Sequence, residues 1–385
     1  MVSDLIWAAA DATDALEREF ATLGIEPREV DEGLFALPEP EAGGRRMRPR
    51  FVFSRQVLPG ATEVHAESIR AFARAIVDAI VGVFPDGAPW SLHVVPFEPV
   101  ARGTSLGARA SHRLVRAERP SEAENRKGRV PWARCSFIEE AVVELLSERR
   151  RHLLRARRTD SRHFKSDESL VQLLLVEPER GFLSIAKAPW PHEHRHQLSF
   201  FPGGKAPVAV DKRPPSRAFA KLIEAEERMG RHIAVGETVV DLGAAPGSWT
   251  FVAIERGARV VSVDRSELRA DLVAHPHVRF VRGDAYRFEP EDPVDWLICD
   301  VIARAERSAE LLLKWLRRGN CRHFVVTLKV DDEAPGTLLH SLATDLSELS
   351  DDFWLQKLTA NKKEVCAFGS ARSVREEARL RTRRE

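Results

Sequence analysis

Apolar and polar residues follow two different arrangements along the chain, and the change falls near residue 216. In the first part, apolar residues at helical spacing, such as Phe72, Ile76 and Ile80, predict amphipathic helices. Short apolar runs between turn-forming residues predict strands. The predicted elements are helices over 11–23, 65–84 and 137–157, extended runs over 33–37, 50–58 and 91–100, and a hairpin over 169–186.

After residue 216, strand and helix patterns alternate, beginning with a helix over 218–229. Such alternation predicts a parallel sheet that helices cover on both faces. The last two apolar runs are close enough in sequence to form an antiparallel hairpin at one edge of this sheet. The predicted strands are 238–242, 259–263, 278–282, 294–299, 324–329, 353–358 and 364–368, with a helix over 309–317.

The length of 385 residues predicts two or three domains. A stretch rich in Pro, Gly and His over 190–215 is the expected linker. Between residues 102 and 165 there are 17 Lys and Arg against 8 Asp and Glu, an excess typical of phosphate-binding surfaces. The run 149–158 also fits a helix end with a solvated basic face. The expected divisions are an N-terminal α/β subdomain over 1–100, a basic region over 101–189, the linker, a second α/β domain over 216–370 and a charged tail over 371–385.

Composition indicates a soluble globular protein, with 43% hydrophobic residues, 30% charged residues and a net charge of +1. No apolar run is long enough to cross a membrane and the N-terminal segment lacks a signal-peptide pattern, so a cytoplasmic protein is expected. The four cysteines are far apart, which favours reduced thiols over a disulfide scaffold. His192, His194 and His196 have no neighbouring Cys or carboxylate cluster, so no metal site is expected.

The loop DLGAAPGSWT, residues 241–250, is the strongest candidate for a ligand site. Gly243 and Gly247 allow the backbone to approach a ligand, whereas Pro246 removes a donor that a pyrophosphate would use. Asp264 ends the next strand about 20 residues later, where an adenosine ribose finds its carboxylate partner. Asp284 follows the third strand and can accept from an adenine amino group. This order favours S-adenosylmethionine, with a nicotinamide dinucleotide as the alternative.

Two further strands carry ionisable residues at their carboxyl ends, where open α/β sheets place their sites. These are Asp300 after the fourth strand and Lys329 at the end of the fifth. Lys329 is a candidate base, because desolvation or a neighbouring cation makes a lysine ammonium easier to deprotonate. Lys221 and Glu364 also belong to the candidate site, although either residue alone is more often a surface charge.

In order and spacing, the segments SRAFAKL, DLGAAPGSWT, ICDV, TLKV and KKEV resemble the FtsJ-like ribose 2′-O-methyltransferases with their Lys-Asp-Lys-Glu tetrad. The segments around VDWLICDV and PPSRAFAKL resemble more closely the large-subunit (23S) ribosomal RNA (cytidine-2′-O) methyltransferase M family, over about 205–370. The resemblance implies a C-terminal Rossmann-like domain that uses S-adenosylmethionine. It also implies an N-terminal α+β region, THUMP-like and RNA-binding, and ribosomal RNA as the partner.

Carried over to this sequence, the resemblance implies that Lys329 accepts the proton and that Lys221, Asp300 and Glu364 complete the tetrad. The chain departs from the family at Ser248, where the family has glycine, and at Ala218, where the family has serine. Because Ser248 can act as a helix N-cap, we expect a reshaped but working cofactor pocket. The implied cofactor contacts are Gly243, Ala245, Pro246, Gly247, Ser248, Asp264, Asp284 and Asp300.

Two other functions remain open. The departures at Ser248 and Ala218 keep the hypothesis of a decayed methyltransferase that only binds RNA, although the complete tetrad favours an enzyme. Methylation of a base or of a protein amine would use an Asn/Asp-Pro-Pro-aromatic loop after the fourth strand, whereas residues 300–303 read Asp-Val-Ile-Ala. A monomer without DNA or membrane partners is the expectation.

Overall fold

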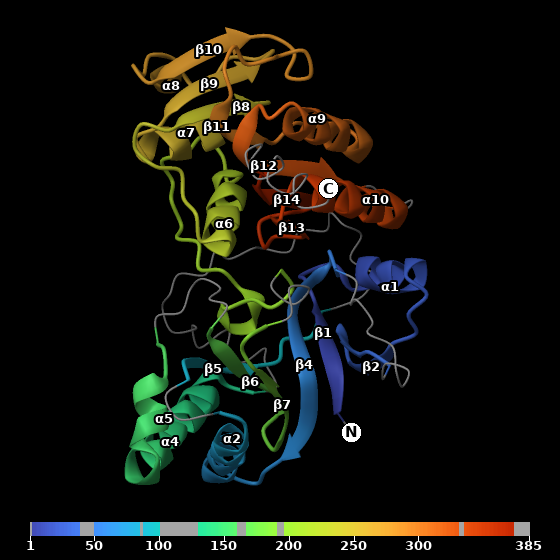
Figure 1. Cartoon of the computed structure of the whole chain (residues 1–385), viewed down its shortest axis with the longest axis vertical. Coiled ribbons are helices and arrows are strands. Elements are labelled where there is room, and N and C mark those ends of the chain that lie inside the picture. The colour runs from blue at the N-terminus through green and yellow to red at the C-terminus, as the bar shows by residue number, and fades with distance from the viewer. Residues whose placement is uncertain are drawn as a thin grey trace, which may run out of the picture. The chain divides into compact units, whose positions relative to one another are not determined.

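A computed structural model describes residues 2–38, 50–84, 88–100, 130–159, 167–190, 196–330 and 335–372 (Figure 1). The described residues form two compact units, which meet in sequence between Pro207 and Val208 and are treated one at a time below. We call them the N-terminal unit and the C-terminal unit. The division falls inside the range 190–215 that was expected to be a linker.

The N-terminal unit is built on a seven-stranded sheet with the order β2-β3-β1-β4-β7-β6-β5. Only β5 and β6 form a parallel pair, and the other neighbours are antiparallel. The strands are β1 (Val2–Ala8), β2 (Arg28–Asp31), β3 (Leu34–Ala36), β4 (Ser54–His65), β5 (Trp90–Pro96), β6 (Ser169–Glu177) and β7 (Arg180–Ala186). The helices are α1 (Thr13–Thr22), α2 (Ile69–Val83), α4 (Trp132–Arg149) and α5 (Arg151–Ala156), with a short 3₁₀ turn η2 (Pro202–Gly204).

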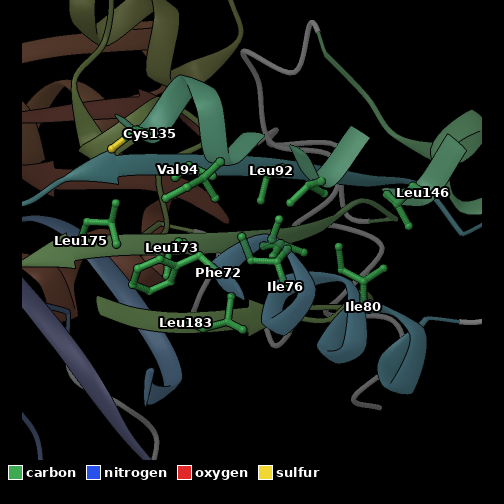
Figure 2. Packing of buried hydrophobic residues seen from close by; sticks show 14 of the residues in the cluster. Phe72, Ile76, Ile80, Leu92, Val94, Cys135, Leu146, Leu173, Leu175 and Leu183 are labelled. Atoms are coloured by element: carbon green, nitrogen blue, oxygen red, sulfur yellow. The ribbon is translucent and has the colours of Figure 1, made fainter. Parts of the chain in front are cut away.

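Helix α2 carries the apolar stripe that the sequence predicted. Phe72, Ile76 and Ile80 are fully buried and belong to one cluster with residues of β5, β6 and α4 (Figure 2). Ser68 caps the helix by accepting from the backbone N–H of Ala71, at 3.1 Å. The predicted hairpin 169–186 is present as β6 and β7. Strand β1 was not predicted from the sequence.

Residues 196–207 pack into the N-terminal unit although the composition suggested a linker. Leu198, Phe200 and Phe201 are buried. The side-chain amide of Gln56 donates to Ser199 O at 2.9 Å and accepts from Ser199 N at 2.9 Å, so it replaces a pair of ladder hydrogen bonds. His192 and His194 lie outside the described residues, and His196 is buried.

The C-terminal unit is also built on a seven-stranded sheet, with the order β10-β9-β8-β11-β12-β14-β13. The first five strands are parallel. β14 pairs antiparallel with both β12 and β13, so the predicted edge hairpin is confirmed. The strands are β8 (Thr238–Leu242), β9 (Arg259–Asp264), β10 (Val278–Arg282), β11 (Val294–Cys299), β12 (Cys321–Lys329), β13 (Asp352–Gln356) and β14 (Glu364–Ser370). The helices are α6 (Phe219–Met229), α7 (Ser248–Glu255), α8 (Ala270–Val273), α9 (Ala305–Arg317) and α10 (Pro335–Leu349).

Helices cover both faces of this sheet, with α6 and α7 on one side and α9 and α10 on the other (Figure 1). Phe219, Trp249, Trp296 and Phe368 belong to the core on the α6 and α7 side. An α/β fold with a Rossmann-like parallel sheet is therefore confirmed for this unit. Helix α10 was not predicted, although Leu339, Leu342 and Leu346 are buried at helical spacing.

Candidate active site

The predicted acidic residues come to one edge of the C-terminal sheet, because the carboxyl ends of parallel strands share an edge. Asp264 is the last residue of β9, and Asp300 directly follows β11. Asp284 lies two residues beyond β10, which runs in register with β9 so that Arg282 pairs with Asp264. Lys329 is the last residue of β12 at the same edge.

The glycines of the loop after β8 are required by its backbone. Gly243 has a φ of 75° and Gly247 a φ of 111°, in the left-handed region that favours glycine. A Cβ on Gly243 would overlap Cγ1 of Val301, and a Cβ on Gly247 would overlap Cδ1 of Leu272. The loop is therefore packed closely against the residues that follow β11 on one side and against α8 on the other.

Asp264 holds this loop in place. Its Oδ2 accepts from the backbone N–H of Ala245 at 3.0 Å, and its Oδ1 accepts from the N–H of Ser266 at 2.8 Å. Gly243 N donates to Val263 O at 2.9 Å, so the loop follows the end of β9. The Asp264 carboxylate is half-buried and keeps further acceptor capacity for a ligand hydroxyl.

Asp284 is an ionised acceptor beside Asp264. The backbone N–H of Tyr286 donates to its Oδ1 at 2.9 Å, and Arg265 donates to its Oδ2 at 2.8 Å. The Tyr286 hydrogen bond and, after it, the Arg265 guanidinium hold the pKa of Asp284 below its usual value. The carboxylate therefore remains charged and able to accept from an amino group.

Ser248 does not act as the expected N-cap. Gly247 occupies the N-cap position of α7, and Ser248 is the first helical residue, buried at 4% exposure. Its Oγ accepts from Ser216 N at 2.8 Å and lies 2.7 Å from Ser216 Oγ. The sequence did not indicate this contact, because Ser216 lies 32 residues before Ser248 in the chain. Ser248 thus links the loop to the segment that leads to Ala218 and Lys221.

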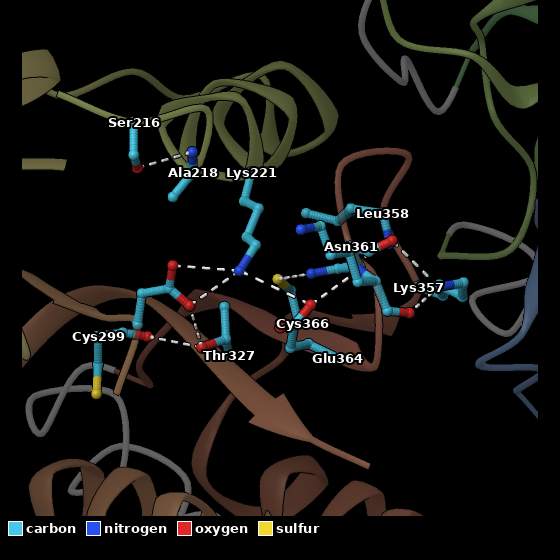
Figure 3. A network of polar contacts seen from close by, with 12 residues as sticks. Ser216, Ala218, Lys221, Cys299, Thr327, Lys357, Leu358, Asn361, Glu364 and Cys366 are labelled. Atoms are coloured by element: carbon cyan, nitrogen blue, oxygen red, sulfur yellow. Dashed lines mark hydrogen bonds and ion pairs between the residues drawn. The ribbon is translucent and has the colours of Figure 1, made fainter. Parts of the chain in front are cut away.

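Lys221, Asp300 and Thr327 form a hydrogen-bonded group at the strand edge. Figure 3 shows Lys221 and Thr327 within this group. The Lys221 ammonium lies 3.0 Å from Asp300 Oδ1 and 3.2 Å from Oδ2. Thr327 Oγ1 donates to Asp300 Oδ1 at 2.7 Å. Burial alone would lower the pKa of Lys221, but the carboxylates of Asp300 and Glu364 outweigh it and raise the pKa above its usual value. Lys221 is therefore a fixed positive charge in this group.

Glu364 joins the same group from β14. Its Oε2 lies 3.8 Å from the Lys221 ammonium. In the β12–β14 ladder, Lys329 is directly opposite Glu364 and Thr327 is directly opposite Cys366. Residues directly opposite, and residues two apart on one strand, point to the same face of a sheet. Lys329 therefore shares a face with Thr327 and Glu364. We call Lys221, Asp300, Thr327 and Glu364 the strand-edge cluster.

Part of the chain that contains this site is similar to a family of known proteins. The model of the FtsJ-like methyltransferases matches residues 214–334. This segment is similar to the FtsJ-like methyltransferases. The match spans the loop after β8, both acids that follow it and the residues of β11 and β12. FtsJ-like methyltransferases use S-adenosylmethionine, so the expected class of cofactor is confirmed.

The relatives are ribosomal RNA methyltransferases by name. The protein called Ribosomal RNA large subunit methyltransferase M from Laribacter hongkongensis is 36% identical over 173 residues, which is 43% of this chain and 44% of the relative. The protein of the same name from Xylella fastidiosa is 43% identical over 123 residues, 30% of this chain and 35% of the relative. The expected resemblance is confirmed for this part of the chain, and each alignment spans less than half of the relative.

Among solved structures, a Burkholderia thailandensis 1,6-didemethyltoxoflavin-N1-methyltransferase is 17% identical, with 40% of this chain and 80% of that chain covered. The TM-score of this match is 0.31.

Several residues that shape the C-terminal unit were not predicted from the sequence. Asp241 is buried in β8, where its Oδ2 accepts from Thr250 Oγ1 at 2.6 Å and burial raises its pKa to about 7. An acid inside an apolar strand was the available signal. Thr327 was missed because a threonine within a strand is ordinary in sequence.

A turn between β13 and β14 orders Glu364 and was also missed. Lys357 is buried and donates to Asn361 O at 3.2 Å and to Lys362 O at 2.6 Å. Lys362 N donates to Glu364 Oε2 at 2.8 Å. Glu224, on the same helix as Lys221, accepts from Thr359 N at 2.8 Å. Within the described parts of the chain, there is no group of three or more His, Cys, Asp or Glu residues arranged for a metal ion, and no helix is long and apolar enough to cross a membrane.

Proposed function

We propose that this protein transfers a methyl group from S-adenosylmethionine to a ribose 2′-hydroxyl of RNA, with a cytidine of large-subunit ribosomal RNA as the substrate. The observation that carries the proposal is the strand-edge cluster, with Lys329 on the same face as Thr327 and Glu364. The name of the relatives, Ribosomal RNA large subunit methyltransferase M, supports the substrate class.

The cluster suits a reaction in which a weakly acidic hydroxyl must lose its proton as it attacks. S-adenosylmethionine supplies, when bound, a methyl group on a positively charged sulfur. Lys329 takes the proton of the ribose hydroxyl as a general base. Asp300 and Glu364 hold the Lys221 ammonium, and Thr327 fixes the orientation of Asp300. Positioning of the acceptor by these fixed groups contributes a large part of the rate.

The residues around the loop fit this cofactor. Gly243, Ala245 and Pro246 are partly or fully exposed and would contact it, whereas Gly247 and Ser248 are buried and would act by holding the loop. Of the remaining predicted contacts, Asp264 would accept from the ribose hydroxyls, Asp284 from the adenine amino group, and Asp300 would lie near the methionine end.

We assign RNA capture to the basic region 101–189 as a THUMP-like region, in a monomeric cytoplasmic protein. The excess of 17 Lys and Arg over 8 Asp and Glu between 102 and 165 supports this assignment. Residues 101–129 and 160–166 of the expected basic region lie outside the described residues. Arg157, inside the basic run 149–158, pairs with Glu139, so not every charge of that run is directed at a ligand.

The proposal is tested by incubating unmodified large-subunit ribosomal RNA with the protein and radiolabelled S-adenosylmethionine, followed by mapping of ribose methylation. Lys329→Met should reduce methyl transfer by at least about 10³-fold and leave cofactor affinity, measured by calorimetry, within about threefold. Lys314→Met is the matched control, because Lys314 is a surface residue paired with Glu289. Full activity of Lys329→Met would remove Lys329 as the proton acceptor.

The decayed-methyltransferase hypothesis predicts a different result from the same experiment. The wild-type chain would then bind the RNA and transfer no label. The strand-edge cluster favours the enzyme. Removing charged groups from water costs free energy even when they are paired, and a protein without the activity would have no need of such a cluster.

A further inference from the structure

Ile302 is an apolar side chain held out from the sheet edge that carries the strand-edge cluster. It is 89% exposed and lies two residues after Asp300, in the turn between β11 and α9. Single exposed apolar residues are common on protein surfaces and need no function. The position of Ile302, rather than its exposure alone, sets it apart.

The turn that carries Ile302 is fixed on both sides. Val301 packs so closely against Gly243 that its Cα lies 3.1 Å from where a Cβ on Gly243 would be. Ala303 N donates to Val301 O at 3.1 Å, which closes the turn tightly around Ile302. Arg304 forms a backbone bridge with Lys329. Ile302 therefore stands at the tip of a short turn that joins the cofactor loop to the strand end of the proposed base.

The strand order separates Ile302 from the residues assigned to the adenosine. Asp264 ends β9 and Asp284 follows β10, whereas Ile302 follows β11, and β8 lies between β9 and β11. The neighbour of β11 on the other side is β12, which ends at Lys329. Ile302 thus lies on the side where the acceptor nucleotide must place its ribose if Lys329 is to take the proton.

We propose that Ile302 makes an apolar contact with the nucleobase of the nucleotide whose ribose is methylated, and so positions that ribose. This inference rests on the proposed function. Every base presents an apolar face, so the contact favours the presence of a base over its identity. The backbone of the turn is fixed and a β-branched side chain has few χ1 rotamers, so Ile302 loses little conformational freedom on contact and is suited to orient a flexible nucleotide.

The first test compares Ile302→Ser with two other variants on an unmodified transcript of large-subunit ribosomal RNA. Ile302→Ser should raise the KM for RNA about 10-fold and leave the Kd for S-adenosylmethionine within twofold. Ile302→Leu should restore the KM to within about threefold of the wild type. Val235→Ser is the matched control, since Val235 is 85% exposed and precedes β8, at the opposite end of the same sheet.

The second test removes the base instead of the side chain. A transcript with an abasic ribose at the mapped nucleotide should lose about 10-fold in kcat/KM with the wild type and less than twofold with Ile302→Ser. Equal losses in both proteins would overturn the contact. So would an unchanged KM for RNA, or a weakened cofactor, in Ile302→Ser. If the wild type transfers no methyl group, the proposed function and this inference both fall; if the wild type and Ile302→Ser are equally active, only this inference falls.

Discussion

The two units contain sheets of seven strands each, and one buried charged group in each unit has very different surroundings. In the N-terminal unit, the buried carboxylate of Glu19 accepts from Val52 N and Phe53 N, which belong to one loop. In the C-terminal unit, Lys221, Asp300 and Glu364 come from different elements and meet in one cluster. Neighbouring antiparallel strands place their carboxyl ends at opposite edges of a sheet, whereas parallel strands place them all at one edge.

This difference separates structural charges from functional ones. A charge that satisfies backbone groups, as Glu19 does, stabilises one loop, and its removal affects that loop. A charge shared among several strands sets the geometry of a site, and its removal affects every member. The comparison therefore predicts strong coupling between substitutions in the C-terminal cluster and local, pH-dependent effects at Glu19.

Asp300→Ala should produce the largest effect. It removes the acceptor of both Lys221 and Thr327 and leaves the Lys221 ammonium with Glu364 at 3.8 Å. We expect a loss of about 2–4 kcal/mol in the free energy of unfolding, since one partner of a mostly buried pair is lost. Methyl transfer should fall by at least about 10³-fold, measured with radiolabelled cofactor.

The double variant Lys221→Met/Asp300→Leu tests whether the cluster is shared. Replacing both charges by apolar side chains removes the closest pair as a unit and leaves only the half-buried Glu364 without its partner at 3.8 Å, so urea unfolding should show a smaller loss than Asp300→Ala alone, about 1 kcal/mol. If the losses of the single variants Lys221→Met and Asp300→Leu add up to the loss of the double variant, the two residues act independently. The comparison with the N-terminal unit would then fail.

Glu19 should give a pH-dependent effect in the other unit. Burial raises its pKa from 4.5 to about 8, against the opposing effect of the Val52 and Phe53 hydrogen bonds. Between these two pH values the folded state keeps a proton that the unfolded state has lost. The stability of the wild type should therefore fall with rising pH relative to Glu19→Gln, with a slope of up to about 1.4 kcal/mol per pH unit.

The readout for Glu19 is urea unfolding of both proteins from pH 5 to pH 9. The difference between them cancels the titration of all other groups. A difference that is flat over this range would show that Glu19 titrates normally. Such a result would also remove the proposed contrast between Glu19, which serves one loop, and the strand-edge cluster, which joins several elements.

Much of the C-terminal unit could be predicted from the sequence because local pattern and global fold agree there. Strand–helix alternation predicts the parallel sheet, and the carboxyl ends of its strands indicate where Asp264, Asp284, Asp300 and Lys329 lie. The approach of Lys221 to Asp300 required the resemblance to a family, because 79 residues separate the two in the chain.

Other features could not be predicted because their signals are not local. The hydroxyl of Ser248 looks like a helix cap in sequence, but its partner is Ser216 across the loop. Gln56 and Ser199 are hydrogen-bonded although 143 residues separate them in the chain. The composition of residues 196–207 carries no sign of this contact and suggested only a linker. Lys357 is a charged residue by sequence and a buried brace in the structure.

Two glycines of the C-terminal unit separate backbone strain from close packing, and they give the smallest expected effect. Gly243 and Gly236 have φ values of 75° and 81°, so an alanine costs about 1 kcal/mol of backbone strain at either position. Only at Gly243 would the new Cβ also overlap Val301; around Gly236 there is nothing within 4 Å. Gly243→Ala should therefore lower the free energy of unfolding, measured with urea, by about 1–2 kcal/mol more than Gly236→Ala does.

The same pair of variants also bears on the cofactor. Gly243→Ala should raise the Kd for S-adenosylmethionine about 10-fold, measured by calorimetry. The reason is that displacing Val301 moves the loop that the cofactor would contact. Gly236→Ala should leave that affinity unchanged. Adding Val301→Ala to Gly243→Ala removes the overlapping Cγ1 and should recover part of the affinity. If the two glycine variants bind equally well, the contact between the loop and the turn after β11 has no part in binding, and this edge of the parallel sheet is less closely coupled than its cluster suggests.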